Sequence, residues 1–237
     1  MISAVLLMTG VISAVIFMLL LVFRRDLIGV DLSARSVVRL YLYLASLAAV
    51  IVLAIGVSAL LDWGTASAFG SEPVYGRPPL ETVCAVGEKC PDPAQLAQQY
   101  LHQREQQQSQ DLIRGATFTL FGVIFWAAHR LARRFAVAPE EPTSALRRAY
   151  LTLGTFVFGL VTIVLIPVGV YLALSVAFLQ PKPDVYVEGV AGSLSGGIVA
   201  LPVWLFYLMR LVRDFRALGQ TAVPAGRTSP AIARTPA

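Results

Sequence analysis

The chain has 237 residues, of which 57% are hydrophobic and 14% are charged, and its mean hydropathy is +0.70. Soluble domains usually carry about 25% charged residues, so this composition argues against a soluble protein and indicates one that faces lipid. The formal net charge is +5. The arginines stand at the ends of apolar segments, which is typical of membrane orientation and argues against a nucleic-acid partner.

Five apolar segments are long enough, or nearly so, to cross a bilayer, which takes about 20 residues. They are residues 2–23, 40–61, 115–131, 149–179 and 190–209. The first has no basic residues before it and no clear cleavage site, so we expect an uncleaved anchor and not a signal peptide. The predicted fold is an all-α integral membrane protein with five transmembrane helices.

The segments predict the following organisation of the chain. We expect a transmembrane anchor helix at 1–23, a cytoplasmic link and second span at 24–61, an extracytoplasmic loop at 62–111, a third span at 112–135, a hairpin of spans four and five at 146–216 and a cytoplasmic tail at 217–237. The tail is rich in Ala, Pro, Thr and Arg without an apolar period, which predicts disorder.

The distribution of charge predicts the orientation. Residues 24–39, 130–148 and 210–237 contain fourteen of the nineteen Lys and Arg but five of the fourteen acids, a net charge of +9 against −4 elsewhere. Positively charged loops remain in the cytoplasm. We therefore expect the N-terminus outside and the C-terminus in the cytoplasm.

Both cysteines, Cys84 and Cys90, lie in the predicted extracytoplasmic loop. Disulfides persist in that compartment, and one closing so short a loop would stabilise it by roughly 2 kcal/mol. The alternative is a pair of free thiols. A structural zinc site is not expected, because zinc usually takes four protein ligands.

The second half of this loop predicts a long helix, whereas the first half, from Gly70 to Pro79, is rich in Gly and Pro and should be irregular. Asp92 and Pro93 have the residue types of an N-cap and a first helical position. No Gly or Pro follows before Gly115, so one helix should run from about Pro93 into the third span. Its outer 18 residues would project about 27 Å. An apolar stripe along it is formed by Leu96, Tyr100 and Leu101; the stripe could pack against the loop or bind a partner.

Two parts of the chain are similar to each other. The matching segments are 39–44 with 148–153, where spans two and four begin, and 130–135 with 210–215, where spans three and five end. The similarity predicts two parallel-repeat hairpins related by a pseudo-twofold axis, forming a four-helix bundle with the N-terminal helix added.

At these residues the chain resembles a bacterial membrane-protein family of unknown function, whose hairpins begin with Arg-x-Leu-Tyr-Leu-Tyr-Leu and end with a Trp-x-x-His pattern. Residues 39–44 and the segment from Trp126 to His129 match this pattern better than the second hairpin, in which Thr152 replaces a Tyr. The resemblance covers spans two to five and implies a bacterial cytoplasmic (inner) membrane. It implies no activity, because the family has none assigned.

Small residues indicate where helices approach each other closely within lipid. Span two offers Ala45, Ala49 and Gly56, and span five offers Gly192 and Gly196 in a GxxxG pattern. Whether these residues pack within the chain or against a partner is open.

The sequence shows no catalytic constellation. It has no P-loop, dinucleotide fingerprint, HExxH or GxSxG, so we expect no enzyme, no metal site and no required cofactor. No acid falls inside a predicted span, which disfavours ion coupling by carboxylates. His102 and His129 lie on opposite sides of the predicted membrane and cannot share one haem. His129 alone could bind a haem or pigment, or be an ordinary interfacial residue.

The remaining candidate residues are a group of arginines on the predicted cytoplasmic side. They are Arg130, Arg133, Arg134, Arg147 and Arg148. We expect them to set the topology and to contact anionic lipid; the alternative is a phosphate-binding enzyme site.

These observations favour a non-catalytic accessory or structural subunit of a larger membrane complex, possible contexts being respiratory or photosynthetic. Its expected partners are the bilayer and other membrane-protein subunits. A small transporter or channel is the first alternative, and a pigment- or haem-binding protein is the second.

Overall fold

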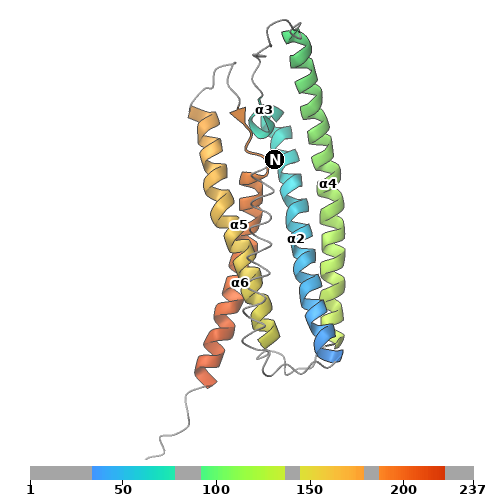
Figure 1. Ribbon diagram of the computed structural model, residues 1–237, viewed down its shortest axis with the longest axis vertical. Helices are drawn as coiled ribbons and strands as arrows, with labels where there is room; N and C mark the ends of the chain where they lie inside the picture. The colour runs from blue at the N-terminus through green and yellow to red at the C-terminus, as the bar shows by residue number, and fades with distance from the viewer. Residues whose placement is uncertain (1–33, 78–91, 137–144, 179–186, 222–237) are drawn as a thin grey trace, which may run out of the picture.

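The computed structural model describes residues 34–77, 92–136, 145–178 and 187–221 (Figure 1). The elements are α2 (Ala34–Phe69), α3 (Ser71–Tyr75), β1 (Gly76–Arg77), α4 (Pro93–Ala136), α5 (Ala145–Phe178), β2 (Val187–Glu188) and α6 (Ser193–Thr221). Four of the five helices, α2, α4, α5 and α6, are long and apolar enough to cross a membrane. The predicted first span, Cys84, Cys90 and most of the tail lie outside the described residues.

Helix α2 is longer than the span predicted for it. It passes Asp62, where the apolar segment ends, and continues to Phe69. Between Asp62 and Gly70 the sequence contains no Pro. Its one Gly in this stretch, Gly64, lies inside the helix and does not end it. Gly70 has a φ of 92°, a left-handed conformation that favours glycine and ends the helix.

Helix α4 is continuous over 44 residues, which confirms the long helix predicted from about Pro93 into the third span. The backbone N–H of Ala94 donates to Oδ1 of Asp92 at 3.0 Å, so Asp92 is the expected N-cap. In Figure 1 the first turns of α4 rise beyond the ends of all other described helices.

The segment after α2 is more ordered than predicted. Instead of being irregular from Gly70 onward, it forms α3 and then β1, which pairs antiparallel with β2. The N–H of Ala191 also donates to the carbonyl of Val74 at 2.9 Å. The partner strand lies more than 100 residues further along the chain, which is why local composition did not reveal this order.

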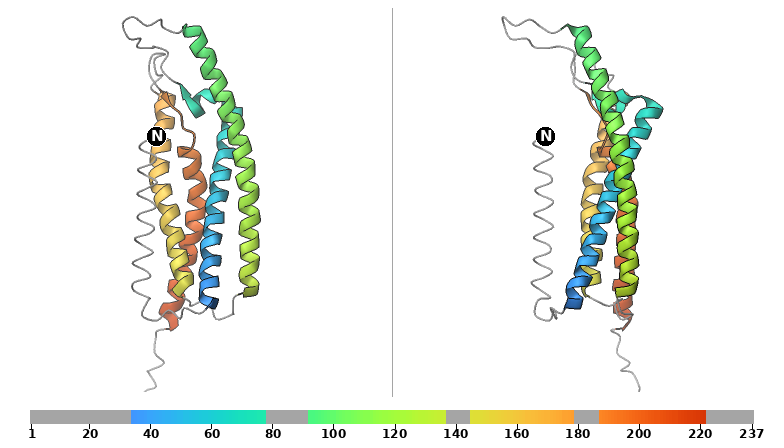
Figure 2. Two further views of the ribbon diagram at one scale, coloured as in Figure 1. Left: turned by 45° about the vertical axis from the view of Figure 1, so that its right-hand side comes forward. Right: turned by 90° about the vertical axis from the view of Figure 1, so that its right-hand side faces the viewer.

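The helices form two antiparallel pairs, α2 with α4 and α5 with α6 (Figure 2). Glycines lie where the backbones approach most closely. A Cβ at Gly56 would lie 2.4 Å from the backbone N of Thr119, and one at Gly169 would lie 2.7 Å from the Cα of Leu194. Both of these close approaches are made within the chain.

The two pairs do not form the symmetric bundle that the sequence repeat predicts. Helix α2 lies against both α5 and α6, whereas α4 packs chiefly against α2 and α3. The motif-equivalent residues also differ, since Tyr41 is 61% exposed and Tyr150 is half-buried. The duplication therefore stays a prediction. The apolar core lies between α2, α5 and α6 and contains Leu47, Leu151, Leu153, Phe158, Ala200 and Tyr207.

Candidate functional site

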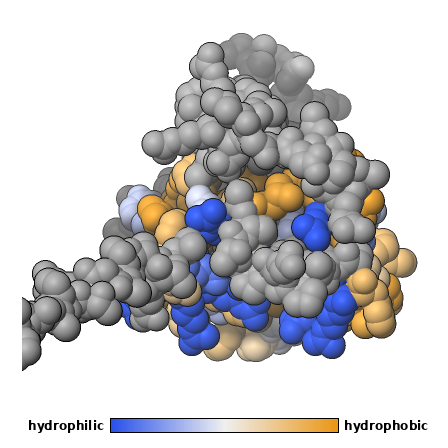
Figure 3. Space-filling model, turned by 90° about the horizontal axis from the view of Figure 1, so that it is seen from below, coloured by the Kyte–Doolittle hydropathy of each residue, from blue (hydrophilic) through white to orange (hydrophobic). Residues whose placement is uncertain are grey.

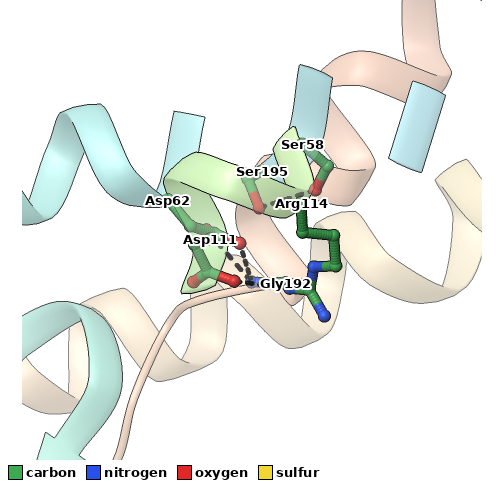
Figure 4. A network of polar contacts seen from close by, with 6 residues as sticks. All are labelled: Ser58, Asp62, Asp111, Arg114, Gly192 and Ser195. Atoms are coloured by element: carbon green, nitrogen blue, oxygen red, sulfur yellow. Dashed lines mark hydrogen bonds and ion pairs between the residues drawn. The ribbon is translucent and has the colours of Figure 1, made fainter. Parts of the chain in front are cut away.

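Two polar clusters occupy opposite ends of the helix bundle. We call the first the carboxylate cluster; it consists of Tyr75 and of the six residues drawn in Figure 4, which are Ser58, Asp62, Asp111, Arg114, Gly192 and Ser195. We call the second the tyrosine cluster; it consists of Tyr43, Ser46, Arg133, Tyr150 and Tyr207. Each cluster draws residues from several helices, so each depends on the tertiary fold.

In the carboxylate cluster, Asp62 caps a helix that is distant in sequence. The backbone N of Gly192 lies 3.2 Å from Oδ1 and 3.1 Å from Oδ2 of Asp62, and it donates to this carboxylate. Asp62 is 6% exposed. The carbonyl of Gly192 accepts the first helical bond of α6 from Gly196. An N-cap N–H has no acceptor inside its helix, and the positive end of the helix dipole favours a carboxylate there.

This geometry corrects the predicted role of Gly192 in helix packing. Gly192 has a φ of 76°, and a Cβ placed on it would meet nothing within 4 Å. The residue is needed for its backbone conformation and its N–H. The close contact between α6 and α5 is made instead by Gly196 and Gly197, against Leu165 and Ile166 respectively.

Asp111 lies in the same cluster and is 5% exposed. Its Oδ1 accepts from the guanidinium of Arg114 at 2.5 Å, while the Arg114 side chain itself is 54% exposed. The buried hydroxyl of Tyr75 has no hydrogen-bond partner among the described residues. Burial, together with the nearby Asp111 carboxylate, raises the pKa of the Tyr75 phenol above its usual value. A phenol is protonated at neutral pH even at its usual pKa of about 10, and it can donate a hydrogen bond.

A serine pair within the carboxylate cluster connects α2 with α6. The hydroxyl oxygens of Ser58 on α2 and Ser195 on α6 lie 3.0 Å apart. The cluster therefore combines two buried carboxylates with one guanidinium, a phenol and two hydroxyls. Such groups can bind a cation or exchange a proton, and they also hold four chain segments together.

At the opposite end, three tyrosines meet between the helix pairs. The hydroxyl oxygens of Tyr150 on α5 and Tyr207 on α6 lie 2.6 Å apart, and Tyr207 is 2% exposed. The ring of Tyr43 on α2 lies against Tyr150, with 4.9 Å between centroids. The tyrosines thus join α2 to the α5–α6 pair.

Arg133 extends the tyrosine cluster to α4. Its guanidinium lies 5.3 Å from the ring centroid of Tyr43 and 5.7 Å from that of Tyr150, distances at which a cation is attracted to an aromatic face. Its Nη2 also donates to the hydroxyl of Ser46 at 3.3 Å. Arg133 is therefore a link between α4 and the rest of the bundle.

The other arginines of the predicted group have separate surroundings. Arg147 pairs with Asp214 of α6 at 3.1 Å, and Arg130 lies over the ring of Trp126, 5.1 Å from its centroid. Arg134 is exposed, and Arg148 is half-buried. The structure thus places Arg133 and Arg147 between helices and leaves Arg130 and Arg134 on the outside.

His129 lies on α4 near the C-terminal end of this helix. Its Nδ1 is 2.7 Å from the carbonyl oxygen of Phe125, and its ring centroid is 5.9 Å from that of Tyr41. A carbonyl only accepts, so Nδ1 carries the proton and Nε2 of the neutral ring keeps its lone pair. Iron- and magnesium-ligating histidines commonly have this arrangement.

The sequence reasoning missed Asp62 and Asp111 because both lie just beyond the apolar segments. A signal was nevertheless present. Asp111, Gly115 and Gly122 recur at helical spacing, and a Cβ at either glycine would lie within 3 Å of α2. Asp111 lies one helical turn before Gly115, and residues four apart lie on the same face of a helix. Asp111 could therefore have been predicted on the face of α4 that packs against α2.

Residues 94–185 match the model of a protein family described as a domain of unknown function, DUF5671. The match begins at the start of α4 and extends past the end of α5, and so covers one helix of each antiparallel pair. It is consistent with an uncharacterised family and does not show the repeated motifs. Comparisons with curated proteins and with solved structures give no match.

Proposed function

We propose that the chain spans a bacterial cytoplasmic membrane five times, with its N-terminus outside and its C-terminus in the cytoplasm. The support is the separation of charge between the two ends of the described bundle. One end carries Asp62, Glu72, Asp92, Glu105, Asp111 and Glu188 with Arg77, Arg104 and Arg114. The other carries Asp214 with Arg35, Arg39, Arg130, Arg133, Arg134, Arg147, Arg148, Arg210, Arg213 and Arg216. Arginine-rich ends remain in the cytoplasm.

Single cysteines in a background without Cys84 and Cys90 test this orientation. We expect a membrane-impermeant thiol reagent to label Gln103→Cys on intact spheroplasts. Arg213→Cys should be labelled only after the membrane is opened. The reverse pattern would invert the topology.

Within that membrane, we propose that the protein is a non-catalytic accessory subunit of a larger assembly and that α4 is its contact element. The observation that carries this proposal is the outer half of α4. Its contacts with other described elements lie at its base, where Arg104 approaches Glu72 at 4.0 Å and Gln108 donates to Ser67 at 2.9 Å. Beyond Arg104 the helix continues for about three turns to Pro93.

A helix of this kind has little reason to be stable by itself. Isolated helical segments shorter than about 12–15 residues are marginal in water, and this one is rich in Gln and exposes Leu101 by 54%. Contact with another subunit would supply the missing stabilisation. The membrane half of α4 likewise exposes large apolar side chains on several sides, including Phe118, Leu120, Phe121, Ile124 and Phe125.

The test is to isolate the full-length protein from its native membrane in mild detergent and measure the size and composition of the particle. We expect stoichiometric partner subunits. Leu101→Glu should release them, because it places a charge on the apolar stripe, whereas Gln106→Glu, the same new side chain at another exposed position of α4, should not. A wild-type protein that elutes as a lone monomer would refute the proposal.

A small transporter remains a second candidate because of the carboxylate cluster. Asp62 lies within the membrane-length stretch of α2, whereas we expected no acid inside a span. Asp62 is also nearly fully buried, beside Asp111. In proteoliposomes, a pH-gradient-driven flux that is lost in Asp111→Asn and kept in Glu105→Gln would establish this function. Absence of any flux in the wild type would remove it.

A further inference from the structure

We propose that the arginine-rich end of the bundle binds the phosphate group of an anionic phospholipid, held by Arg39, Arg133 and Arg147. This inference rests on membrane insertion and is independent of the accessory-subunit function. Figure 3 views this end and shows hydrophilic side chains gathered there, with apolar side chains beside them.

The three arginines lie on helix faces that border one seam between the helix pairs. Arg133 lies over the rings of Tyr43 and Tyr150, which contact each other. Arg39 precedes Tyr43 by four residues on α2, and Arg147 precedes Tyr150 by three residues on α5. Residues three or four apart lie on the same face of a helix. Arg39 and Arg147 therefore flank the tyrosine pair one turn nearer to the end of the bundle.

The seam has more positive than negative charge. Asp214 is the one carboxylate that the described residues place there, and its Oδ1 bonds to Arg147 at 3.1 Å. Among the described residues, the seam therefore holds three guanidiniums and one carboxylate. Arg39 is half-buried, and its Nε is buried without a hydrogen-bond partner among the described residues. A buried donor without an acceptor is unfavourable, so this position favours an anionic ligand.

The chemistry of the seam selects phosphate. Arginine presents a planar set of N–H donors that matches phosphate oxygens, and several arginines can share one group. The tyrosine rings hold Arg133 in place, which reduces the side-chain entropy lost on binding. Phosphate is also the anion that the surrounding membrane offers at this depth, in anionic headgroups of the cytoplasmic leaflet.

Exposed apolar residues at the same end of the bundle indicate that the phosphate belongs to a lipid. Val37, Val38 and Tyr41 on the first turns of α2 are 55%, 49% and 61% exposed, and by their spacing they lie on other faces of α2 than Arg39. Acyl chains that cover these faces would bring lipid headgroups to the depth of the arginines.

The experiment measures the thermal unfolding of the purified full-length protein in detergent micelles, with phosphatidylglycerol, with phosphatidylcholine, or with inorganic phosphate. With phosphatidylglycerol at a tenfold excess over its Kd, we expect Tm to rise by about 3–6 °C. Phosphatidylcholine and inorganic phosphate should give much smaller increments. Native mass spectrometry should find phosphatidylglycerol retained on the protein.

Variants locate the site. Arg39→Gln should reduce the phosphatidylglycerol increment to that of phosphatidylcholine, and Arg39→Lys should keep part of it. Arg213→Gln, which removes one exposed charge from the same end of the bundle, should leave the increment unchanged. Because each increment is taken against the same variant without lipid, a less stable variant still gives a result. If Arg39→Gln and Arg213→Gln lose equal amounts, the effect is general surface charge and the proposal is wrong. Equal protection by inorganic phosphate would overturn the lipid assignment.

Discussion

The carboxylate of Asp62 on α2 accepts the backbone N–H of Gly192, a residue 130 positions further along the chain, and so caps α6 from another helix. Helices usually obtain their N-caps from the residue at their own start. Here that residue is a glycine with no side chain to offer, and Asp62 binds the backbone N–H of this glycine at the start of α6. The first helix pair thereby fixes where the last helix begins.

Removing this cap should destabilise the protein. For Asp62→Ala we expect a loss of about 2 kcal/mol, since hydrogen bonds to charged groups contribute about 1.5–3 kcal/mol, which corresponds to a fall in Tm of about 4–8 °C for a chain of this size. Asp62→Asn keeps an acceptor oxygen and should lose less. The measurement is thermal unfolding in detergent. As a control, Asp92→Ala removes the exposed cap of α4 and should cost about 1 kcal/mol. An unchanged Tm in Asp62→Ala would show that the interaction contributes nothing.

The close approach of α2 and α4 predicts a second effect. Gly56→Leu should strongly destabilise the pair, because its Cβ would lie 2.4 Å from the backbone N of Thr119 and the overlap cannot be relieved by a side-chain rotation. We expect a cost of about 3 kcal/mol or more. Gly64→Leu is the matched control on the same helix, where a Cβ meets nothing within 4 Å. Similar yields and Tm values for the two variants would contradict the packing seen between these helices.

The sequence allowed prediction of the features that depend on local pattern. The membrane-length helices follow from apolar runs, and the continuity of α4 follows from the Asp92–Pro93 start and the absence of Gly or Pro before Gly115. The pairing of α2 with α4 and of α5 with α6 agrees with the two hairpins predicted from the repeated segments. Each of these features is encoded within a few turns of chain.

The features that were not predicted depend on contacts between distant segments. Asp62 binds a residue at the start of α6, and β1 pairs with β2, which lies just before α6. The tyrosine cluster is similar, since Tyr43, Tyr150 and Tyr207 come from three helices. Local composition indicates that such residues are polar or aromatic but not which partner each one meets, and this is why a symmetric bundle was expected where α4 instead lies to one side.

The tyrosine pair provides a prediction about the opposite end of the bundle. Tyr207→Phe removes a hydroxyl that is buried and bonded to Tyr150, so we expect a loss of about 1 kcal/mol. Tyr207→Ala should cost about 3–5 kcal/mol because it leaves a cavity in the core. Tyr171→Phe, at a residue 68% exposed, is the control for loss of a tyrosine hydroxyl and should leave Tm unchanged. A Tyr207→Phe protein as stable as the wild type would show that the hydroxyl pair has no net effect.

The predicted disulfide between Cys84 and Cys90 can be tested by chemistry alone. We expect both thiols to resist alkylation in protein isolated from its native membrane, and to become reactive after reduction. Mass spectrometry of the peptide spanning both residues should show the loss of two hydrogens. Two alkylated cysteines without reduction would identify free thiols and would remove one argument for an extracytoplasmic loop.

The pigment alternative rests on His129 and on the state of its ring. With Nδ1 donating to the carbonyl of Phe125 at 2.7 Å, Nε2 is left as the nitrogen that could bind the central metal of a haem or chlorophyll. If the native protein carries such a group, its visible absorbance band should be lost in His129→Ala. His102→Ala, which removes a histidine whose side chain is 78% exposed on the outer part of α4, should keep the band. A pure protein without visible absorbance would leave His129 as an interfacial residue that closes a hydrogen bond within its own helix.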